Sequence, residues 1–225
     1  MRTLIASDWH LGHYSPPRQV ALAAGFLLHV RRRGDRLVLN GDIFEGLFEP
    51  VARAETAHPA LAAAIADLID TGQAQRTEGN HDPGTGAPFI VLEHPAAGRV
   101  LVMHGHRVDA TGAPSEHAGD RISRRFGHLA VVRGFARTME AAVSTLAAGA
   151  VDRLYRRHCL ACVERHGCDL GVFGHNHRRY LAADDRYANA GCLRDDRLEF
   201  LVLDEHGPRL ASFGTAELAA SPPLR

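Results

Sequence analysis

The sequence predicts an α/β protein that folds as a single domain of 225 residues. Short apolar runs of strand length alternate with longer segments whose apolar residues recur at helical spacing. Several of the runs end in Gly, Asp, Asn or His, as strands do at the edge of an α/β sheet where ligands bind. The chain is long enough for one hydrophobic core, and no linker or internal repeat divides it.

In the first half, predicted strands and helices alternate. A buried strand over 3–7 is followed by a helix over 16–33, which stops at Gly34 because glycine readily adopts the left-handed conformation that ends helices. Further apolar or helically spaced segments follow in order: a strand at 36–40, a helix at 58–71 closed by Gly72, and strands at 75–78 and 99–103.

The second half begins with a helical insertion at about 117–167. Three helices are expected there, at 117–127, 130–147 and 150–167, with no strand among them. Strand character then returns, and the remaining predicted strands lie at 169–173, 179–182, 187–190, 198–203 and 209–213.

Charge and composition narrow the class of protein. The 26 cationic and 26 acidic residues cancel, whereas general nucleic-acid binders carry a basic excess, so no nucleic-acid partner is expected. An Asp at position 8 interrupts any apolar leader, and no run is long enough to cross a bilayer. The expected location is the cytoplasm.

Five predicted strands are followed by loops that contain metal-binding residue types. The loops are Asp8-Trp9-His10, Gly41-Asp42, Gly79-Asn80-His81-Asp82, His104-Gly105-His106 and Gly174-His175-Asn176-His177. Each pair taken singly also occurs in ordinary turns. Five such loops at strand ends instead indicate one site, and carboxylate, amide and imidazole ligands suit Mn²⁺, Fe, Zn²⁺ or Ni²⁺ better than Ca²⁺.

The order of these motifs, DWH, GD, GNHD, HGH and GHNH, resembles the five-block signature of the calcineurin-like metallophosphoesterases. The resemblance spans residues 8–177 and implies a four-layer α/β/β/α sandwich with a helical lid. It also implies a hydrolase with two divalent transition-metal ions, manganese first among them. One ion would be held by Asp8, His10, Asp42 and His177, and the other by Asp42, Asn80, His104 and His175.

The resemblance further implies a reaction. A hydroxide bridging the two ions would attack phosphorus in line, splitting a phosphoester or pyrophosphate bond. His81 matches the catalytic His that contacts the phosphate or protonates the leaving oxygen, and Asp82 is a candidate to orient it. His13 and His106 are either supporting residues or ordinary surface and turn residues, and Asn189 is expected to be structural.

The insertion bears on the substrate. Its arginines either form a solvated helix face or contact an anionic substrate over an apolar groove; the substrate-binding candidates are Asn80, Arg124, Arg125, Arg133 and Arg137. A helical insertion at this place, with the block Gly41-Asp-Ile-Phe-Glu45, resembles the UDP-2,3-diacylglucosamine pyrophosphatases. That group carries Arg where this chain has His81 and Asp where it has His106.

Two substrate classes therefore remain, with different locations. A nucleoside-diphosphate lipid such as UDP-2,3-diacylglucosamine would bring the lid to the inner membrane surface. The alternative is a soluble phosphodiesterase or phosphomonoesterase acting on nucleotides or small esters. A non-catalytic scaffold with the same fold is a third hypothesis, against which the intact ligand motifs argue.

The insertion also contains closely spaced cysteines. Cys159 and Cys162 have the CxxC spacing of structural zinc sites, with Cys168, His158 and His166 nearby. On a continuous helix the same cysteines would face a core as small buried residues. Both interpretations remain open from the sequence.

Overall fold

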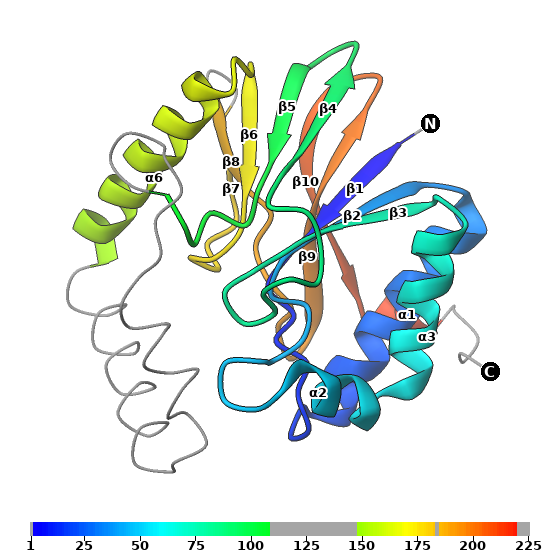
Figure 1. Cartoon of the computed structure of the whole chain (residues 1–225). Coiled ribbons are helices and arrows are strands. Elements are labelled where there is room, and N and C mark those ends of the chain that lie inside the picture. Colours follow the sequence, from blue (N-terminus) through cyan, green and yellow to red (C-terminus); the bar gives the residue numbers. More distant parts are fainter. Residues whose placement is uncertain (1, 109–147, 183–184, 220–225) are drawn as a thin grey trace.

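The computed structural model describes residues 2–108, 148–182 and 185–219 and contains two five-stranded mixed sheets (Figure 1). The first sheet has the order β10-β9-β1-β2-β3. Its strands are β1 (Thr3–Ala6), β2 (Arg36–Asn40), β3 (Ala74–Thr77), β9 (Arg197–Asp204) and β10 (Gly207–Gly214). β1, β2 and β3 are parallel, whereas β9 runs antiparallel to β1.

The second sheet has the order β4-β5-β6-β8-β7. Its strands are β4 (Ile90–His94), β5 (Gly98–Val102), β6 (Leu170–Phe173), β7 (Tyr180–Leu181) and β8 (Tyr187–Asn189). β5, β6 and β8 are parallel, and β4 and β7 pair antiparallel at the two edges. Each sheet therefore contains three adjacent parallel strands whose carboxyl ends can carry a site.

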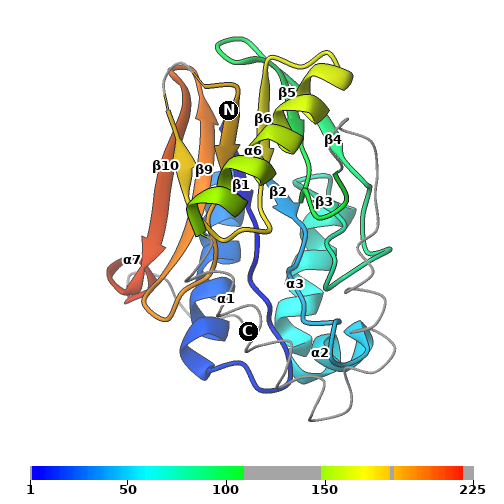
Figure 2. The same ribbon diagram turned by 90° about the vertical axis from the view of Figure 1, so that its left-hand side faces the viewer.

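Helices cover the outer faces of both sheets (Figures 1 and 2). α1 (Pro17–Arg33) and α3 (Pro59–Asp70) cover the first sheet, and α6 (Ala148–Arg165) covers the second. Two short helices, α2 (Val51–Ala57) and α7 (Thr215–Ala219), lie beside α3 and α1. None of the helices in the described ranges is both long and apolar enough to cross a bilayer.

Alternating side chains in the strands divide the interior into three apolar layers. Leu37 and Leu39 of β2 face α1 and α3, whereas Val38 between them faces the second sheet. On the outer face of the second sheet, Leu101 and Phe173 pack against α6. This period-2 pattern is what a strand covered on both faces requires, and it confirms the α/β/β/α sandwich.

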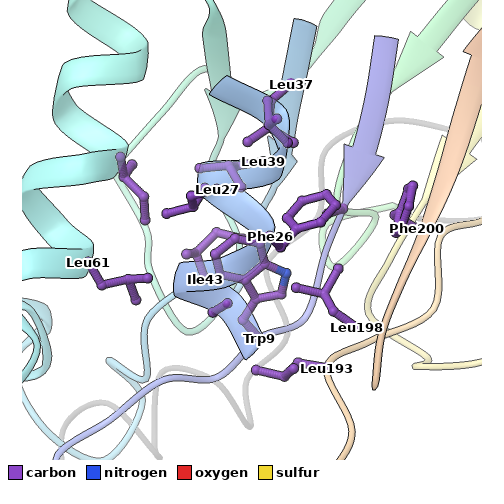
Figure 3. Packing of buried hydrophobic residues seen from close by; sticks show 14 of the residues in the cluster. Trp9, Phe26, Leu27, Leu37, Leu39, Ile43, Leu61, Leu193, Leu198 and Phe200 are labelled. Atoms are coloured by element: carbon purple, nitrogen blue, oxygen red, sulfur yellow. The ribbon is translucent and has the colours of Figure 1, made fainter. Parts of the chain in front are cut away.

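Phe26 of α1 is central to the first apolar layer (Figure 3). Its ring lies 6.2 Å from that of Trp9 and 4.9 Å from that of Phe200, and it is fully buried. Replacing Phe26 with Ala should lower the free energy of unfolding by about 3–5 kcal/mol, because the cavity cannot collapse fully. Urea denaturation measures this loss.

The matched control is Ile69→Ala, since Ile69 is 38% exposed. It should cost about 1 kcal/mol or less, as most surface substitutions do. Equal losses in the two variants would mean that the layer around Phe26 is not the main core of the fold.

The structure extends and corrects the expected elements. It adds α2, β4 and α7, which the sequence reading missed, and it moves β3 and β5 one residue earlier than 75–78 and 99–103. The third expected insertion helix, at 150–167, is present as α6. The expected helices at 117–127 and 130–147 lie outside the described residues, so the lid boundary at 117 remains a prediction.

Candidate metal centre

The five motif-bearing loops meet at one end of the sandwich, where the carboxyl ends of β1, β5 and β6 point (Figure 1). Backbone bonds tie the loops together: the Trp9 amide donates to the Asp42 carbonyl at 2.8 Å, and the Gly174 amide donates to the His104 carbonyl at 3.1 Å. The His175 amide donates to Asp8 Oδ1 at 3.0 Å and so joins the two sheets. Residues far apart in the sequence thus form one site.

Asp8, His10 and His177 form the first group of ligand atoms. Asp8 Oδ1 lies 3.1 Å from His177 Nε2, and the Nε2 atoms of His10 and His177 lie 3.0 Å apart. Separations near 3 Å between ligand atoms are expected around one ion with bonds of about 2.1 Å. These three residues are therefore arranged to hold a cation.

Asp42, His104 and His175 form the second group. Asp42 Oδ2 lies 3.0 Å from His104 Nε2 and also 3.8 Å from His10 Nε2. The carboxylate of Asp42 consequently faces both groups, as a ligand shared by two ions would. His104 and His175 lie with ring centroids 5.4 Å apart.

The buried polar atoms without a hydrogen-bond partner in the described residues include one atom in each of two expected ligands, Asn80 Oδ1 and His104 Nε2. His104 Nε2 approaches Asp42 Oδ2 closely without the alignment of a hydrogen bond. An unsatisfied buried acceptor normally costs about 1–3 kcal/mol. The donor set of carboxylate, amide oxygen and imidazole fits transition metals, and bound cations would satisfy both atoms.

The backbone is strained at several of the expected metal ligands. In the described part of the chain, the non-glycine residues with φ in the left-handed region are Asp8 (57°), His10 (48°), Asp42 (53°), His175 (68°) and His177 (55°). This conformation is rare for residues with a Cβ, and such strain concentrates at functional sites. Five of the seven expected ligands therefore have this strained backbone conformation.

The loop around Asn80 approaches Asp42 so closely that glycine is required next to it. A Cβ on Gly79 would lie 2.1 Å from Asp42 Oδ1. On the other side of Asn80, the His81 amide donates to Asp42 Oδ1 at 2.8 Å. Asn80 itself is buried. Because its neighbours Gly79 and His81 both lie against the Asp42 carboxylate, Asn80 lies beside that carboxylate as well.

Imidazoles balance the buried carboxylates. Burial favours the neutral form of Asp8 and Asp42, but the facing histidines, His104 first among them, together outweigh burial and lower the pKa of both carboxyls. Burial likewise opposes protonation of His104, yet Asp42 and Asp8 raise its pKa to about 10. In His175, burial and the charge on His104 lower the pKa to about 3. Divalent cations would replace the shared protons when they bind.

His81 lies beside the shared carboxylate and is held by Glu45. His81 Nδ1 donates to Glu45 Oε1 at 2.8 Å, and His81 Nε2 lies 3.9 Å from Asp42 Oδ2. Burial would lower the pKa of His81, but Asp42 and Glu45 outweigh it and raise the pKa to about 9. Nearby cations would oppose this rise.

Asp82 does not orient His81, contrary to the expectation from the sequence. Its carboxylate is fully buried and accepts from the amides of Asp42 at 2.9 Å and Ile43 at 2.7 Å. It also accepts from Arg76 Nη2 at 2.7 Å. Asp82 therefore anchors the loop after β2 to the loop after β3, and Glu45 holds His81.

Further hydrogen bonds hold the ligand loops, and the partners Ser7, Asn40 and Tyr155 lie outside the predicted site residues. Ser7 Oγ donates to Asp8 Oδ2 at 2.6 Å, and His104 Nδ1 donates to the Asn40 carbonyl at 3.0 Å. Tyr155 of α6 donates to the Gly174 carbonyl at 3.0 Å. The hydroxyl and imidazole donors fix the side chains that point into the site.

The weaker sequence candidates have different positions. His106 is buried beside His104, and both of its ring nitrogens lack partners among the described residues. His13 is exposed and packs edge-on against Tyr14. Asn189 is structural in its contacts, since its Nδ2 donates to the Gly174 carbonyl at 2.7 Å.

The cysteines pack as a core. Cys159, Cys162 and Cys168 are buried against the second sheet, and burial raises the pKa of the Cys162 thiol to about 11. The groups of metal-binding side chains found within the described ranges do not include them. The buried-core interpretation is therefore favoured over the zinc clip.

The expected substrate-binding arginines Arg124, Arg125, Arg133 and Arg137 lie outside the described residues. On α6, Arg156 pairs with Asp185 and lies over the ring of Tyr180. Arg153 and Arg157 are exposed and are free to meet an anion on the outer face of that helix.

Neither a protein-family model nor a curated protein matches this chain. Several solved structures are similar over nearly its whole length. A double mutant of Vps29 from Entamoeba histolytica is 13% identical with a TM-score of 0.48, and the match covers 95% of this chain and 99% of that one. At this identity and TM-score, the similarity assigns no activity.

Two other similar structures are described as phosphate enzymes. A predicted phosphoesterase from Streptococcus pneumoniae is 13% identical with a TM-score of 0.39, covering 94% of this chain and 97% of that one. A dimetal phosphatase from Danio rerio is 11% identical with a TM-score of 0.44, covering 95% and 98%. At these identities and TM-scores the similarity likewise assigns no activity to this chain.

Proposed function

We propose that this chain is a two-metal hydrolase of phosphoester or pyrophosphate bonds, of the calcineurin-like metallophosphoesterase type. The observation that carries the proposal is the position of Asp42, whose carboxylate lies 3.0 Å from His104 Nε2 and 3.8 Å from His10 Nε2. One ion would be held by Asp8, His10, Asp42 and His177, and the other by Asp42, Asn80, His104 and His175. This complete ligand set argues against a non-catalytic scaffold.

The reaction follows from the arrangement. When bound, the two cations supply an acidified water at neutral pH and neutralise charge on the phosphoryl oxygens. Glu45 holds Nδ1 of His81, so that Nε2 faces the site and can hold a proton near the leaving oxygen. General acid catalysis of this kind typically contributes about 10²–10⁴ in rate.

Metal analysis and metal removal test this proposal. Protein purified without chelator should contain about two transition-metal ions per chain and hydrolyse bis-p-nitrophenyl phosphate or p-nitrophenyl phosphate. Chelation should abolish turnover, and Mn²⁺, which we propose as the native metal, should restore the most activity among Mn²⁺, Fe²⁺, Zn²⁺ and Ni²⁺. Full turnover in metal-free protein, or two bound metals without hydrolysis of any phosphoester or pyrophosphate, would contradict the proposal.

For the substrate, we propose a nucleoside-diphosphate lipid as the first candidate. Beyond the family resemblance, support comes from a hollow of about 510 Å³ on the outer face of α6, lined by Arg153, Arg156, Arg157 and Leu160. Arginines beside an apolar surface suit an anionic lipid headgroup. This substrate would place the protein at the inner membrane surface.

Small phosphate esters and nucleotides are the second candidate, favoured by a narrow cleft directly beside His10. A panel that compares UDP-2,3-diacylglucosamine with bis-p-nitrophenyl phosphate separates the two. Rapid turnover of the diester with none of the lipid would exclude the first candidate. Preference for the lipid by about 100-fold or more in kcat/KM would exclude the second.

A further inference from the structure

A second site adjoins the proposed metal centre. We propose that the cleft between the loop after β1 and the loop before α2 binds one uncharged ring of the substrate, such as an aryl, sugar or nucleobase ring. This inference rests on the proposed phosphoester hydrolysis and names the group that the phosphate carries. The cleft is not expected to bind a second phosphate of the substrate.

Apart from His10, the residues that line the cleft lie outside the metal motifs. It has a volume of about 210 Å³, and its lining includes Tyr14, Phe48 and Glu49. Cavities of about 150 Å³ bind benzene, whereas pockets for whole drug-sized ligands span about 300–1,000 Å³. The cleft therefore has room for a single ring and not for a whole nucleotide.

The cleft opens onto the metal centre because both share His10 and Glu45. The two loops that form it lie side by side at one end of the molecule (Figures 1 and 2), and the His13 amide donates to Glu49 Oε1 at 2.9 Å. A phosphate bound at the metal centre would thus direct one of its substituents into the cleft.

Aromatic side chains give the cleft its affinity for a ring. The Tyr14 ring is 79% exposed and lies edge-on to the His13 ring, with centroids 4.9 Å apart. Phe48 lies on the opposite loop, with its ring 6.3 Å from that of His81. A ring bound between Tyr14 and Phe48 would cover apolar surface that is otherwise in contact with water, and aromatic pairs add to this gain.

Charge determines which rings are accepted. Glu45 and Glu49 both line the cleft, and none of its described lining residues is Arg. Arg53 Nε lies 3.5 Å from Glu49 Oε2 but belongs to α2 and does not line the cleft. Glu45 pairs with His81 and Glu49 with Arg53, but both partners lie outside the cleft lining. The two carboxylates inside the cleft therefore disfavour a phosphate or carboxylate there, while their remaining lone pairs accept hydrogen bonds from hydroxyl or N–H groups.

Phosphonates test the cleft without the complication of leaving-group chemistry. Benzylphosphonate, ethylphosphonate and 4-carboxybenzylphosphonate are titrated into the metal-loaded protein by calorimetry and compared as inhibitors of bis-p-nitrophenyl phosphate hydrolysis. Benzylphosphonate should bind about tenfold more tightly than ethylphosphonate, as expected for partial burial of one ring. The carboxylated ring should bind about tenfold more weakly than benzylphosphonate.

Substitutions in the cleft test whether the ring of the phosphonate binds there. Tyr14→Ala should reduce the benzyl preference to about twofold while leaving ethylphosphonate affinity unchanged, and Glu49→Gln should improve binding of the carboxylated ring several-fold. The matched control is Phe89→Ala, since Phe89 is also an exposed aromatic residue, 37% accessible, and packs against His166 away from the cleft. It should change none of the three affinities.

The outcomes separate this proposal from the hydrolase assignment. Equal affinity for the benzyl and ethyl compounds, or a benzyl preference that survives Tyr14→Ala, would overturn the ring site while hydrolysis of the diester still stands. Ring-selective binding without any hydrolysis would overturn the hydrolase assignment and leave the cleft as a binding site. Loss of both would overturn both.

Discussion

Asp42→Ala should abolish metal-dependent hydrolysis, lowering kcat/KM by at least about 10³-fold. The carboxylate of Asp42 faces both groups of ligand atoms, so its removal takes a ligand from each ion at once. It also leaves the His81 amide, which donates to Asp42 Oδ1, without its partner. Metal content, measured on the same sample, should fall from about two ions per chain to less than one.

The control for this variant is Asp67→Ala. Asp67 is a carboxylate on α3, 44% exposed, and pairs with Arg31 at the surface. Exposed ion pairs contribute little, about 0–1 kcal/mol, so activity and metal content should match the unmodified protein. An Asp42→Ala variant that keeps both ions and substantial turnover would contradict the shared role of this carboxylate.

His81→Ala should lower kcat by about 10²–10⁴-fold, the range typical of a lost general acid, while both ions remain bound. The reason is the position of the side chain: Nε2 faces the site at 3.9 Å from Asp42 Oδ2, and Nδ1 is held by Glu45. Glu45→Gln should have a smaller effect of about tenfold, because it weakens only the hold on Nδ1. Kinetics and metal analysis on each variant measure these effects.

An exposed histidine provides the control. His206→Ala removes an imidazole whose side chain is 84% exposed and should leave turnover unchanged. Loss of metal from His81→Ala would reveal His81 to be a ligand, and an unchanged kcat would remove it from the mechanism.

That the candidate ligands come together was largely predictable, because they stand directly after short apolar strands. β1 and β2 end at Ala6 and Asn40, and the ligands Asp8 and Asp42 follow within two residues. Since parallel strands place their carboxyl ends at one edge, order along the chain translates into proximity in space. The seven expected ligands were named from that rule and the family motifs together.

The residues that hold the ligands were not predictable, because their contacts join distant parts of the chain. Glu45 and His81 lie 36 residues apart, and the block that ends at Glu45 does not indicate which side chain Glu45 contacts. Asp82 was assigned to His81 because the two are adjacent in sequence. Its side chain instead accepts from backbone amides after β2, a direction that only the folded loop determines.

Short or edge elements were missed for a related reason. β4 (Ile90–His94) is only partly buried and pairs with β5 alone, so its pattern is weak. α2 (Val51–Ala57) has seven residues, too few for a helical repeat to stand out. Both depend on packing against neighbours that the sequence does not specify locally.

Anomalous scattering from crystals grown with Mn²⁺ decides whether two ions share the Asp42 carboxylate. Two manganese peaks are predicted, about 3.5–4 Å apart, with the Asp42 carboxylate between them and His10 and His104 on opposite sides. A single peak, or manganese bound away from these side chains, would contradict the two-metal account.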